Sequence, residues 1–271
     1  MQPHQCLWAW FITDFWLLDW ATAGVLVLIN HLVPVHSIEP AHRPYNPQDL
    51  TLAYPLKDGT ISSSVLYALV FAFPTIVFAS VAAAQRSTVD LHHALLSLVE
   101  AFALASGWKR WMNLVGRLRP SWLARVAAGD GGDVADGRLA YPSGHSAYMF
   151  FSATVLTMWG MGKLRLLAHS SQALFPKLLL CLAPLVLATY VSCTRLVDYE
   201  HDFADVNAGC FIGICSGLLA YSLQYPSPWD PCCHLPKLRR RASLLSCQLA
   251  PREGVMELAL ASGRELSSQQ T

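Results

Sequence analysis

Three short groups of residues in this chain combine cations, histidines and a carboxylate. They are Gly116-Arg117-Leu118-Arg119-Pro120; Tyr141-Pro142-Ser143-Gly144-His145; and Thr194-Arg195 followed by His201 and Asp205. Arginine carries a permanent charge on a planar fork that matches phosphate oxygens. Histidine can attack as a nucleophile or move a proton near neutral pH. The residue types therefore indicate chemistry on a phosphate group.

The second group directly precedes a long apolar run that begins at Ser146. If that run is a helix, the Ser143 hydroxyl and the Gly144 and His145 amides lie at its N-terminus, where unpaired donors and the helix dipole favour an anion. His145 would stand in the first turn, able to protonate a departing oxygen. A helix cap with an incidental histidine is the alternative reading of this group alone.

The third group places His201 and Asp205 four residues apart, which is one face of a helix. A carboxylate that holds one ring nitrogen protonated leaves the other nitrogen as a nucleophile. Asp198, three residues before His201, could orient the ring equally well on spacing alone. A structural pair of histidine and aspartate is the alternative without chemistry.

Long apolar blocks must position these groups. The chain has 271 residues, of which 54% are hydrophobic and 14% charged, whereas soluble domains carry roughly 25% charged residues. A helix needs about 20 apolar residues to cross a bilayer. Six blocks qualify: Trp20 to Ile38, Gly59 to Gln85, Leu91 to Trp108, Leu139 to Gly162 without its first residues, Leu178 to Thr194, and Val206 to Trp229. The sequence thus predicts an all-α bundle of six transmembrane helices.

The blocks also predict the organisation of the chain. Residues 1–14 form a short N-terminal segment, residues 15–225 the six-span domain, and residues 226–271 a disordered basic tail rich in proline and serine. Basic residues after the last span favour cytoplasmic termini. The net charge of +1 gives no indication of nucleic-acid binding. Glu100 lies within the third block, where an ionisable side chain needs a partner.

The three groups resemble the signature motifs of the type 2 phosphatidic acid phosphatase and haloperoxidase superfamily. Those motifs are Lys, six residues, Arg-Pro; then Pro-Ser-Gly-His; then Ser-Arg, five residues, His, three residues, Asp. Further stretches resemble the eukaryotic, integral-membrane lipid phosphate phosphatase branch: Arg43 with Asp49 to Pro55, and Asp90 to Ala94. The similarity covers most of residues 15–225.

This resemblance implies metal-independent and cofactor-independent hydrolysis of lipid phosphate monoesters through a phosphohistidine. Substrates would be phosphatidic acid, diacylglycerol pyrophosphate, lysophosphatidate or related lipids. His201 would be the nucleophile, Asp205 would orient it, and His145 would act as acid and then as base. The phosphate would be held by Arg119, Arg195, Ser143 and Gly144. The site would lie at the luminal or extracellular edge of an endomembrane or of the plasma membrane.

Two positions depart from the family pattern. Thr194 replaces the motif serine and keeps the hydroxyl, whereas Met112 stands seven residues before Arg119, where the family has lysine. Lys109 and Arg117 are auxiliary cations that could substitute in part. Since a charge-assisted bond is worth about 1.5 to 3 kcal/mol, we expect reduced turnover, which Met112→Lys should raise. The alternatives are a catalytically impaired lipid-phosphate-binding protein and a lipid phosphotransferase.

Overall fold

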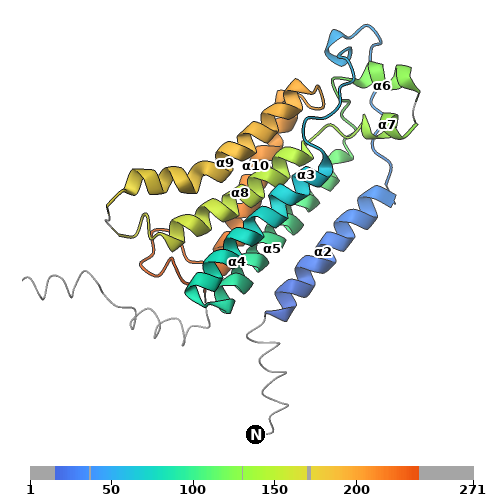
Figure 1. Ribbon diagram of the computed structural model, residues 1–271. Helices are drawn as coiled ribbons and strands as arrows, with labels where there is room; N and C mark the ends of the chain where they lie inside the picture. The colour runs from blue at the N-terminus through green and yellow to red at the C-terminus, as the bar shows by residue number, and fades with distance from the viewer. Residues whose placement is uncertain (1–15, 37, 130, 170–171, 238–271) are drawn as a thin grey trace, which may run out of the picture. The chain divides into compact units, whose positions relative to one another are not determined.

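The regular structure of the described residues is helical throughout (Figure 1). The computed structural model describes residues 16–36, 38–129, 131–169 and 172–237. Its long helices are α2 (Leu17–His36), α5 (Thr88–Asn113), α8 (Gly144–Lys163), α9 (Leu174–Val197) and α10 (Phe203–Gln224). A sixth long helix has three parts, namely α3 (Ser63–Tyr67), the π-helical turn η2 (Ala68–Ala72) and α4 (Phe73–Gln85). The short elements are η1 (Leu50–Leu52), α6 (Trp122–Ala128) and α7 (Gly131–Asp136).

Five of these helices are long and apolar enough to cross a membrane. They are Leu17–Pro34, Ser63–Gln85, Thr88–Asn113, Leu174–Val197 and Phe203–Gln224. The chain is therefore a multi-pass membrane protein, and the predicted all-α class is confirmed. Each of the six apolar blocks coincides with one long helix, but the fourth block, α8, is not among these five.

The central position of α8 explains its more polar composition. It packs against α5, α9 and α10, and most of its residues are buried. The Ser152 hydroxyl donates to the Val70 carbonyl at 2.8 Å, and the Thr157 hydroxyl donates to the Cys181 carbonyl at 2.8 Å. Because protein rather than lipid surrounds α8, it can carry polar side chains that find partners on neighbouring helices.

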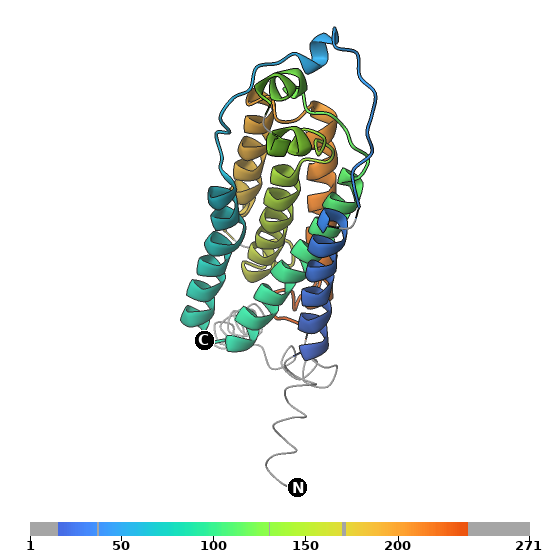
Figure 2. The ribbon, with the colours of Figure 1, turned by 90° about the vertical axis from the view of Figure 1, so that its right-hand side faces the viewer.

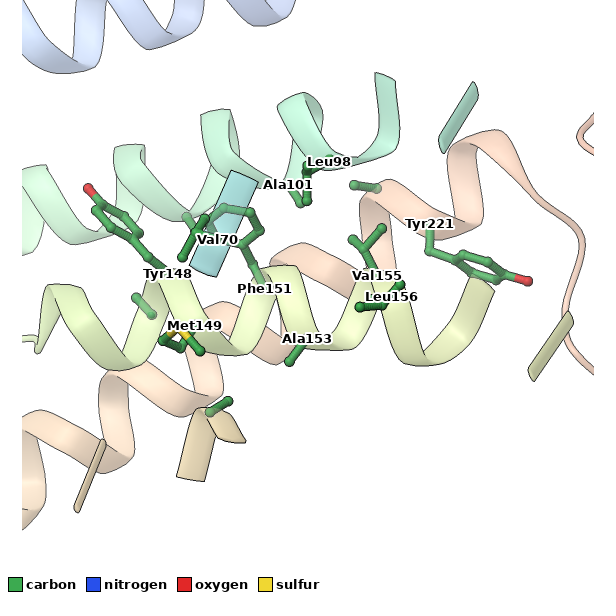
Figure 3. Close-up of a cluster of buried hydrophobic side chains, with 14 of the residues drawn as sticks. Val70, Leu98, Ala101, Tyr148, Met149, Phe151, Ala153, Val155, Leu156 and Tyr221 are labelled. Carbon is green, nitrogen blue, oxygen red and sulfur yellow. The ribbon is translucent and has the colours of Figure 1, made fainter. Parts of the chain in front are cut away.

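Apolar side chains fill the remaining contacts of α8. Figure 3 shows Phe151 and Val155 of α8 directed toward Leu98 of α5, and all three side chains are buried. Within a membrane, such contacts stabilise the bundle by van der Waals packing rather than by the exclusion of water. Through these contacts α8 is the central helix, against which α5, α9 and α10 pack.

Glycines of α10 allow it to approach α8 closely. Gly209, Gly213 and Gly217 recur every four residues and so share one face of α10. A Cβ atom on any of them would lie 2.5 to 2.8 Å from a backbone carbonyl oxygen of α8 or of its N-cap, Ser143. The small-residue seam therefore brings the start of α10 against the start of α8.

At one end of the bundle, α5 and α9 finish while α8 and α10 begin; we call it the site end. In Figures 1 and 2, α6, α7 and the segment between α2 and α3 lie at this end. The Ser143 amide donates to the Asp205 carbonyl at 3.0 Å, which links the starts of α8 and α10. All three sequence groups thus converge here.

The opposite end, which we call the far end, holds a compact ion-pair cluster. The Lys163 Nζ lies 2.5 Å from the Asp90 Oδ1, and the Tyr225 hydroxyl donates to the same oxygen at 2.9 Å. Further into the bundle, the Gln224 amide donates to the Glu100 carboxylate at 2.9 Å, and His93 Nδ1 lies 2.8 Å from the Gln224 Oε1. Gln224 is the partner that Glu100 needed.

Residues 226–236 also pack at the far end. Lys163 donates to the His234 carbonyl at 2.6 Å, and Cys233 is buried against Gly162. The sequence predicted a disordered tail from residue 226, so this boundary was wrong for residues 226–236, which the end of α8 holds in place. The rest of the predicted tail, residues 238–271, and the predicted segment 1–14 lie outside the described residues.

Candidate active site

A cavity of about 430 Å³ opens at the site end. Both predicted histidines, His145 and His201, line it, together with Arg119 and Arg195. The rest of its wall comes from the segment before α3, from α3 itself, and from α5, α7 and α8. This volume lies in the range of about 300 to 1,000 Å³ that is typical of small-molecule sites.

The start of α8 contributes backbone donors to this cavity. Gly144 lines the cavity, and the first amides of a helix have no intrahelical acceptor. Ser143 is fully buried and does not line the cavity, because its hydroxyl caps α8 and accepts from the Ser146 amide and hydroxyl. In the structure Ser143 thus has a capping role, and its contact with phosphate stays a prediction.

His145 stands in the first turn of α8, as predicted. Its Nε2 lies 3.2 Å from the Ile61 carbonyl oxygen. Because a carbonyl only accepts, this nitrogen carries a proton. In the neutral ring Nδ1 is then an acceptor, so His145 can give a proton to a ligand only when both ring nitrogens are protonated.

His201 lies in the loop between α9 and α10. Its Nδ1 donates to the Ala140 carbonyl at 2.7 Å, so its Nε2 keeps a free lone pair. Burial lowers the pKa of His201 to about 4, and the Asp205 carboxylate opposes this effect only in part. The imidazole is therefore neutral at pH 7, as a nucleophile must be.

Asp198 and Asp205, which sequence spacing left as equal candidates for orienting His201, have different partners in the structure. The Asp205 Oδ2 lies 3.8 Å from the His201 Nδ1 and accepts the Asp202 amide at 2.9 Å. Asp198 pairs instead with Arg195 at 2.7 Å and accepts the Thr60 amide at 2.8 Å. Asp205 is thus the carboxylate beside His201, although the Ala140 carbonyl makes the direct hydrogen bond.

Arg195 is buried in the last turn of α9. Its guanidinium is held by Asp198 at 2.7 Å and by the Thr194 hydroxyl at 3.2 Å. The hydroxyl that replaces the family serine therefore has a structural use. The absence of a side chain at Gly59 allows the segment before α3 to run close to this guanidinium, because a Cβ there would lie 3.3 Å from the Arg195 NH1. Arg195 is fixed with one edge toward the cavity.

Arg119 is embedded in a network that the motifs did not predict. Glu200 forms an ion pair with Arg119, and Asp136 lies 2.9 Å from the same guanidinium. Arg125, which is buried, pairs with both Glu200 carboxylate oxygens at 3.1 Å. Glu200 directly precedes His201 and lines the cavity, so this network joins the loop that carries His201 to Arg119.

The two auxiliary cations occupy different places. Lys109 lines the cavity, and its Nζ would lie 3.6 Å from a Cβ built on Gly144. Arg117 pairs with Asp202 at 2.9 Å and with Asp205 at 3.1 Å, and it does not line this cavity. Met112 packs against the apolar core. Of the cations near Met112, Lys109 is therefore the one beside the start of α8.

Sequence reasoning missed Glu200, Asp136, Arg125 and Arg110, of which all but Arg125 line the cavity. Glu200 carried a signal, since it lies inside the third group beside His201. The described residues contain no group of three or more His, Cys, Asp or Glu side chains arranged to hold a metal ion.

Known proteins match this chain along most of its length. The model of the PAP2 superfamily matches residues 94–229. A PA-phosphatase related-family protein of Dictyostelium discoideum is 31% identical over 85% of this chain and 87% of its own length. Lipid phosphate phosphatase 1 of Arabidopsis thaliana is 29% identical over 82% of this chain and 74% of its own length.

A yeast relative extends the set. Diacylglycerol pyrophosphate phosphatase 1 of Saccharomyces cerevisiae is 27% identical over 82% of each chain. No solved structure matches this chain. The family match covers the two histidines, the arginines and the central helix that positions them, and it therefore agrees with the geometry of the site. The chain belongs to the PAP2 superfamily.

Proposed function

We propose that this protein is a membrane-embedded lipid phosphate phosphatase that works through a phosphohistidine on His201. One observation carries this proposal: the rings of His145 and His201 and the guanidinium groups of Arg119 and Arg195 border a single cavity. Phosphoryl transfer needs a nucleophile, an acid and cations around the equatorial oxygens, and these four residues supply them.

In the first step, the His201 Nε2 attacks phosphorus. A bond from nitrogen to phosphorus forms while the ester bond from phosphorus to oxygen breaks, and the electron pair leaves with the lipid oxygen. His145, with both ring nitrogens protonated, gives this oxygen a proton and becomes neutral. The Ala140 carbonyl, which accepts from Nδ1 at 2.7 Å, keeps the attacking nitrogen unprotonated. The nearby Asp205 carboxylate stabilises the positive charge that the ring acquires.

In the second step, water replaces the histidine. Neutral His145 removes a proton as water attacks phosphorus, the bond between nitrogen and phosphorus breaks, and inorganic phosphate leaves with His201 restored. During both steps Arg119, Arg195 and the Gly144 amide hold the phosphate oxygens, whereas Ser143 acts by capping α8. Lys109 takes the place of the motif lysine, and Arg117 supports Asp205 from outside the cavity.

The names of the relatives support lipid phosphates as the substrate class. Their names specify a lipid phosphate phosphatase and a diacylglycerol pyrophosphate phosphatase. The five apolar helices place this chain in a membrane, where such lipids lie. Phosphatidic acid is therefore the first substrate to test, followed by diacylglycerol pyrophosphate and lysophosphatidate.

The decisive assay uses the full chain purified in detergent micelles with phosphatidic acid and excess chelator. We expect the wild type to release inorganic phosphate and His201→Ala to release none above background. His42→Ala is the matched control, because His42 is exposed and pairs with Glu39 outside the cavity. Wild-type protein that binds phosphatidic acid without releasing phosphate would instead identify a catalytically impaired binding protein.

Product analysis separates hydrolysis from phosphotransfer. In water containing a short-chain alcohol, a phosphatase yields mainly inorganic phosphate, whereas a phosphotransferase yields the alcohol phosphate. The presence of Lys109 beside Gly144 favours an active enzyme over a silent one, because the cation that Met112 lacks is restored from one helical turn earlier.

We also propose six spans with cytoplasmic termini and the site on the luminal or extracellular side. In support, α8 has 20 residues, about the length that crosses a bilayer, and it packs against α5, α9 and α10. Asp49→Asn completes an Asn-X-Thr glycosylation acceptor with Thr51 at the site end, and the native sequence has none. We expect this variant to be glycosylated in microsomes. Arg86→Asn, which completes an acceptor with Thr88 between α4 and α5, should stay unmodified, and the reverse pattern would invert the topology.

A further inference from the structure

The cations of the cavity differ in their partners. Arg119 and Arg195 are each held by carboxylates, namely Glu200 with Asp136 and Asp198. Within the described part of the chain, no carboxylate forms an ion pair with Lys109 or Arg110, which are adjacent on α5. Because arginine stays protonated, Arg110 adds a cation without a described carboxylate partner to the two paired arginines, and the cavity therefore favours more negative charge than one phosphate monoester brings.

Arg110 is placed to contact a ligand. It lines the cavity, and its Nε is buried without a hydrogen-bond partner among the described residues. A buried donor of this kind costs free energy unless something accepts from it. Its guanidinium interacts with Tyr148, whose ring also lines the cavity. Arg110 borders a neighbouring cavity of about 500 Å³ as well, so its side chain stands at the wall between two hollow spaces.

Arg110 and Tyr148 lie deeper in the bundle than the catalytic histidines. Tyr148 follows His145 by three residues, which is about 4.5 Å along α8. Arg110 lies three residues before the end of α5 at Asn113, and Leu66 of α3 lines the cavity beside them. Since lipid chains remain in the membrane, the part of a substrate that stays on the lipid extends in this direction from the transferred phosphate.

We propose that Arg110 and Tyr148 form a second anion subsite, which holds the phosphate that a lipid diphosphate retains when its terminal phosphate is transferred. This rests on the proposed function of His201 and His145. It assigns Arg110 the role of a specificity-determining residue that favours lipid diphosphates over lipid monophosphates. The cavity of about 430 Å³ has room for more than one phosphate group.

The chemistry balances without a further reactant. The His201 Nε2 forms a bond to the terminal phosphorus, and the bond from that phosphorus to the bridging oxygen breaks. The electron pair stays on the bridging oxygen, which becomes part of a lipid monophosphate. Arg110 stabilises the negative charge that develops there, so this leaving group depends less on a proton from His145 than a lipid alcohol does.

The test compares two substrates on matched variants. Wild type, Arg110→Gln and Arg43→Gln are assayed with diacylglycerol pyrophosphate and with phosphatidic acid in identical micelles. Arg43 is the control, because it is an exposed arginine at the site end outside this cavity. We expect Arg110→Gln to lower kcat/KM for the diphosphate roughly 10- to 100-fold, the loss of one charge-assisted bond. The kcat/KM of Arg110→Gln for phosphatidic acid should change less than about threefold, because a monophosphate makes no bond to Arg110.

A binding measurement keeps the test independent of turnover. Methylene-bisphosphonate, which cannot be hydrolysed, should inhibit Arg110→Gln less strongly than wild type, whereas vanadate should inhibit both equally. Equal losses on both substrates, or unchanged inhibition by the bisphosphonate, would overturn the second subsite while leaving the phosphatase intact. Wild-type protein inactive on both substrates would overturn the proposed function itself. Retained vanadate inhibition distinguishes a specific effect from misfolding.

Discussion

The two ends of the helical bundle use buried charge in different ways. At the far end, the Lys163 ammonium and the Tyr225 hydroxyl both contact the Asp90 Oδ1, at 2.5 and 2.9 Å. At the site end, arginines and acids also pair, but they do so around a cavity of about 430 Å³. The far-end charges pair with each other inside the protein, whereas the site-end arginines also line a cavity that a ligand can enter.

This difference separates stability from function within one membrane protein. A buried ion pair loses several kcal/mol when one partner is removed, because the remaining charge stays buried. Removing a cation that faces a cavity destabilises the fold less, but it removes more of the stabilisation of the transition state. Substitutions at the far end should therefore change unfolding, and substitutions at the site end should change rate.

The largest expected effect is at the nucleophile. His201→Gln should lower kcat for phosphatidic acid roughly 10⁴-fold or more, as removal of a nucleophilic residue does in other hydrolases. His93→Gln is the matched change at the far end, where His93 contacts Gln224. It should keep kcat within about threefold of wild type, because catalysis does not use it. Comparable rate losses in the two variants, measured as phosphate release, would erase the distinction between the ends.

The next effect belongs to the far end. Lys163→Met should lower the free energy of unfolding by about 3 to 5 kcal/mol, because it leaves the Asp90 carboxylate buried without its cation. The double variant Asp90→Asn with Lys163→Met should recover part of this loss. Unfolding by detergent titration measures both. The surviving folded fraction should keep its kcat, and a kcat that falls in parallel would contradict the separation of the ends.

The sequence alone predicted the helices, the convergence of the three groups and both histidines. Apolar block length and motif spacing carry this information directly. The sequence offered a helix cap at Ser143 only as an alternative. It did not predict that the Ala140 carbonyl accepts the hydrogen bond from His201 Nδ1, because that contact depends on how α8 meets α10. It also missed the order of residues 226–236, since short polar segments become fixed only through partners such as Lys163.

The network of Glu200, Arg119 and Arg125 was missed for the same reason. Charged residues in loops predict solvent exposure from composition, yet Arg125 is buried and its partner lies 75 residues later in the chain. The glycines of α10 were visible as a repeat of four, but only the contact with α8 reveals what that repeat does. Spacing identifies residue types, whereas packing decides which of them meet.

A third, smaller effect tests the cation that replaces the motif lysine. Lys109→Met should lower kcat/KM for phosphatidic acid roughly 10- to 100-fold, through loss of a charge-assisted bond worth about 1.5 to 3 kcal/mol. Met112→Lys in the wild type should raise the rate. In the Lys109→Met background, Met112→Lys should restore most of the lost activity. If Lys109→Met leaves kcat/KM unchanged, Lys109 does not serve the phosphate.

The smallest effect concerns pH and links the nucleophile back to stability. Burial lowers the pKa of His201 to about 4 in the folded chain, against about 6.5 in an unfolded one. As pH falls from 6.5 toward 4, the His201 ring is therefore protonated in the unfolded chain but stays neutral in the folded chain. The free energy of unfolding decreases in this pH range. From about one pH unit above 6.5, the ring is neutral in both the folded and the unfolded chain, and the contribution of this group is constant.

His201→Gln removes this particular contribution. Between pH 7 and 5.5 the wild type should lose about 1 kcal/mol more unfolding free energy than His201→Gln, by proton linkage. Detergent titration at the two pH values measures the difference, and ¹⁵N NMR of the histidine rings should place the His201 titration near pH 4. A titration near 6.5 would mean that the ring is solvated. His201 would then resemble an exposed surface group, and the site end would lack the buried, preorganised histidine that distinguishes it from the far end.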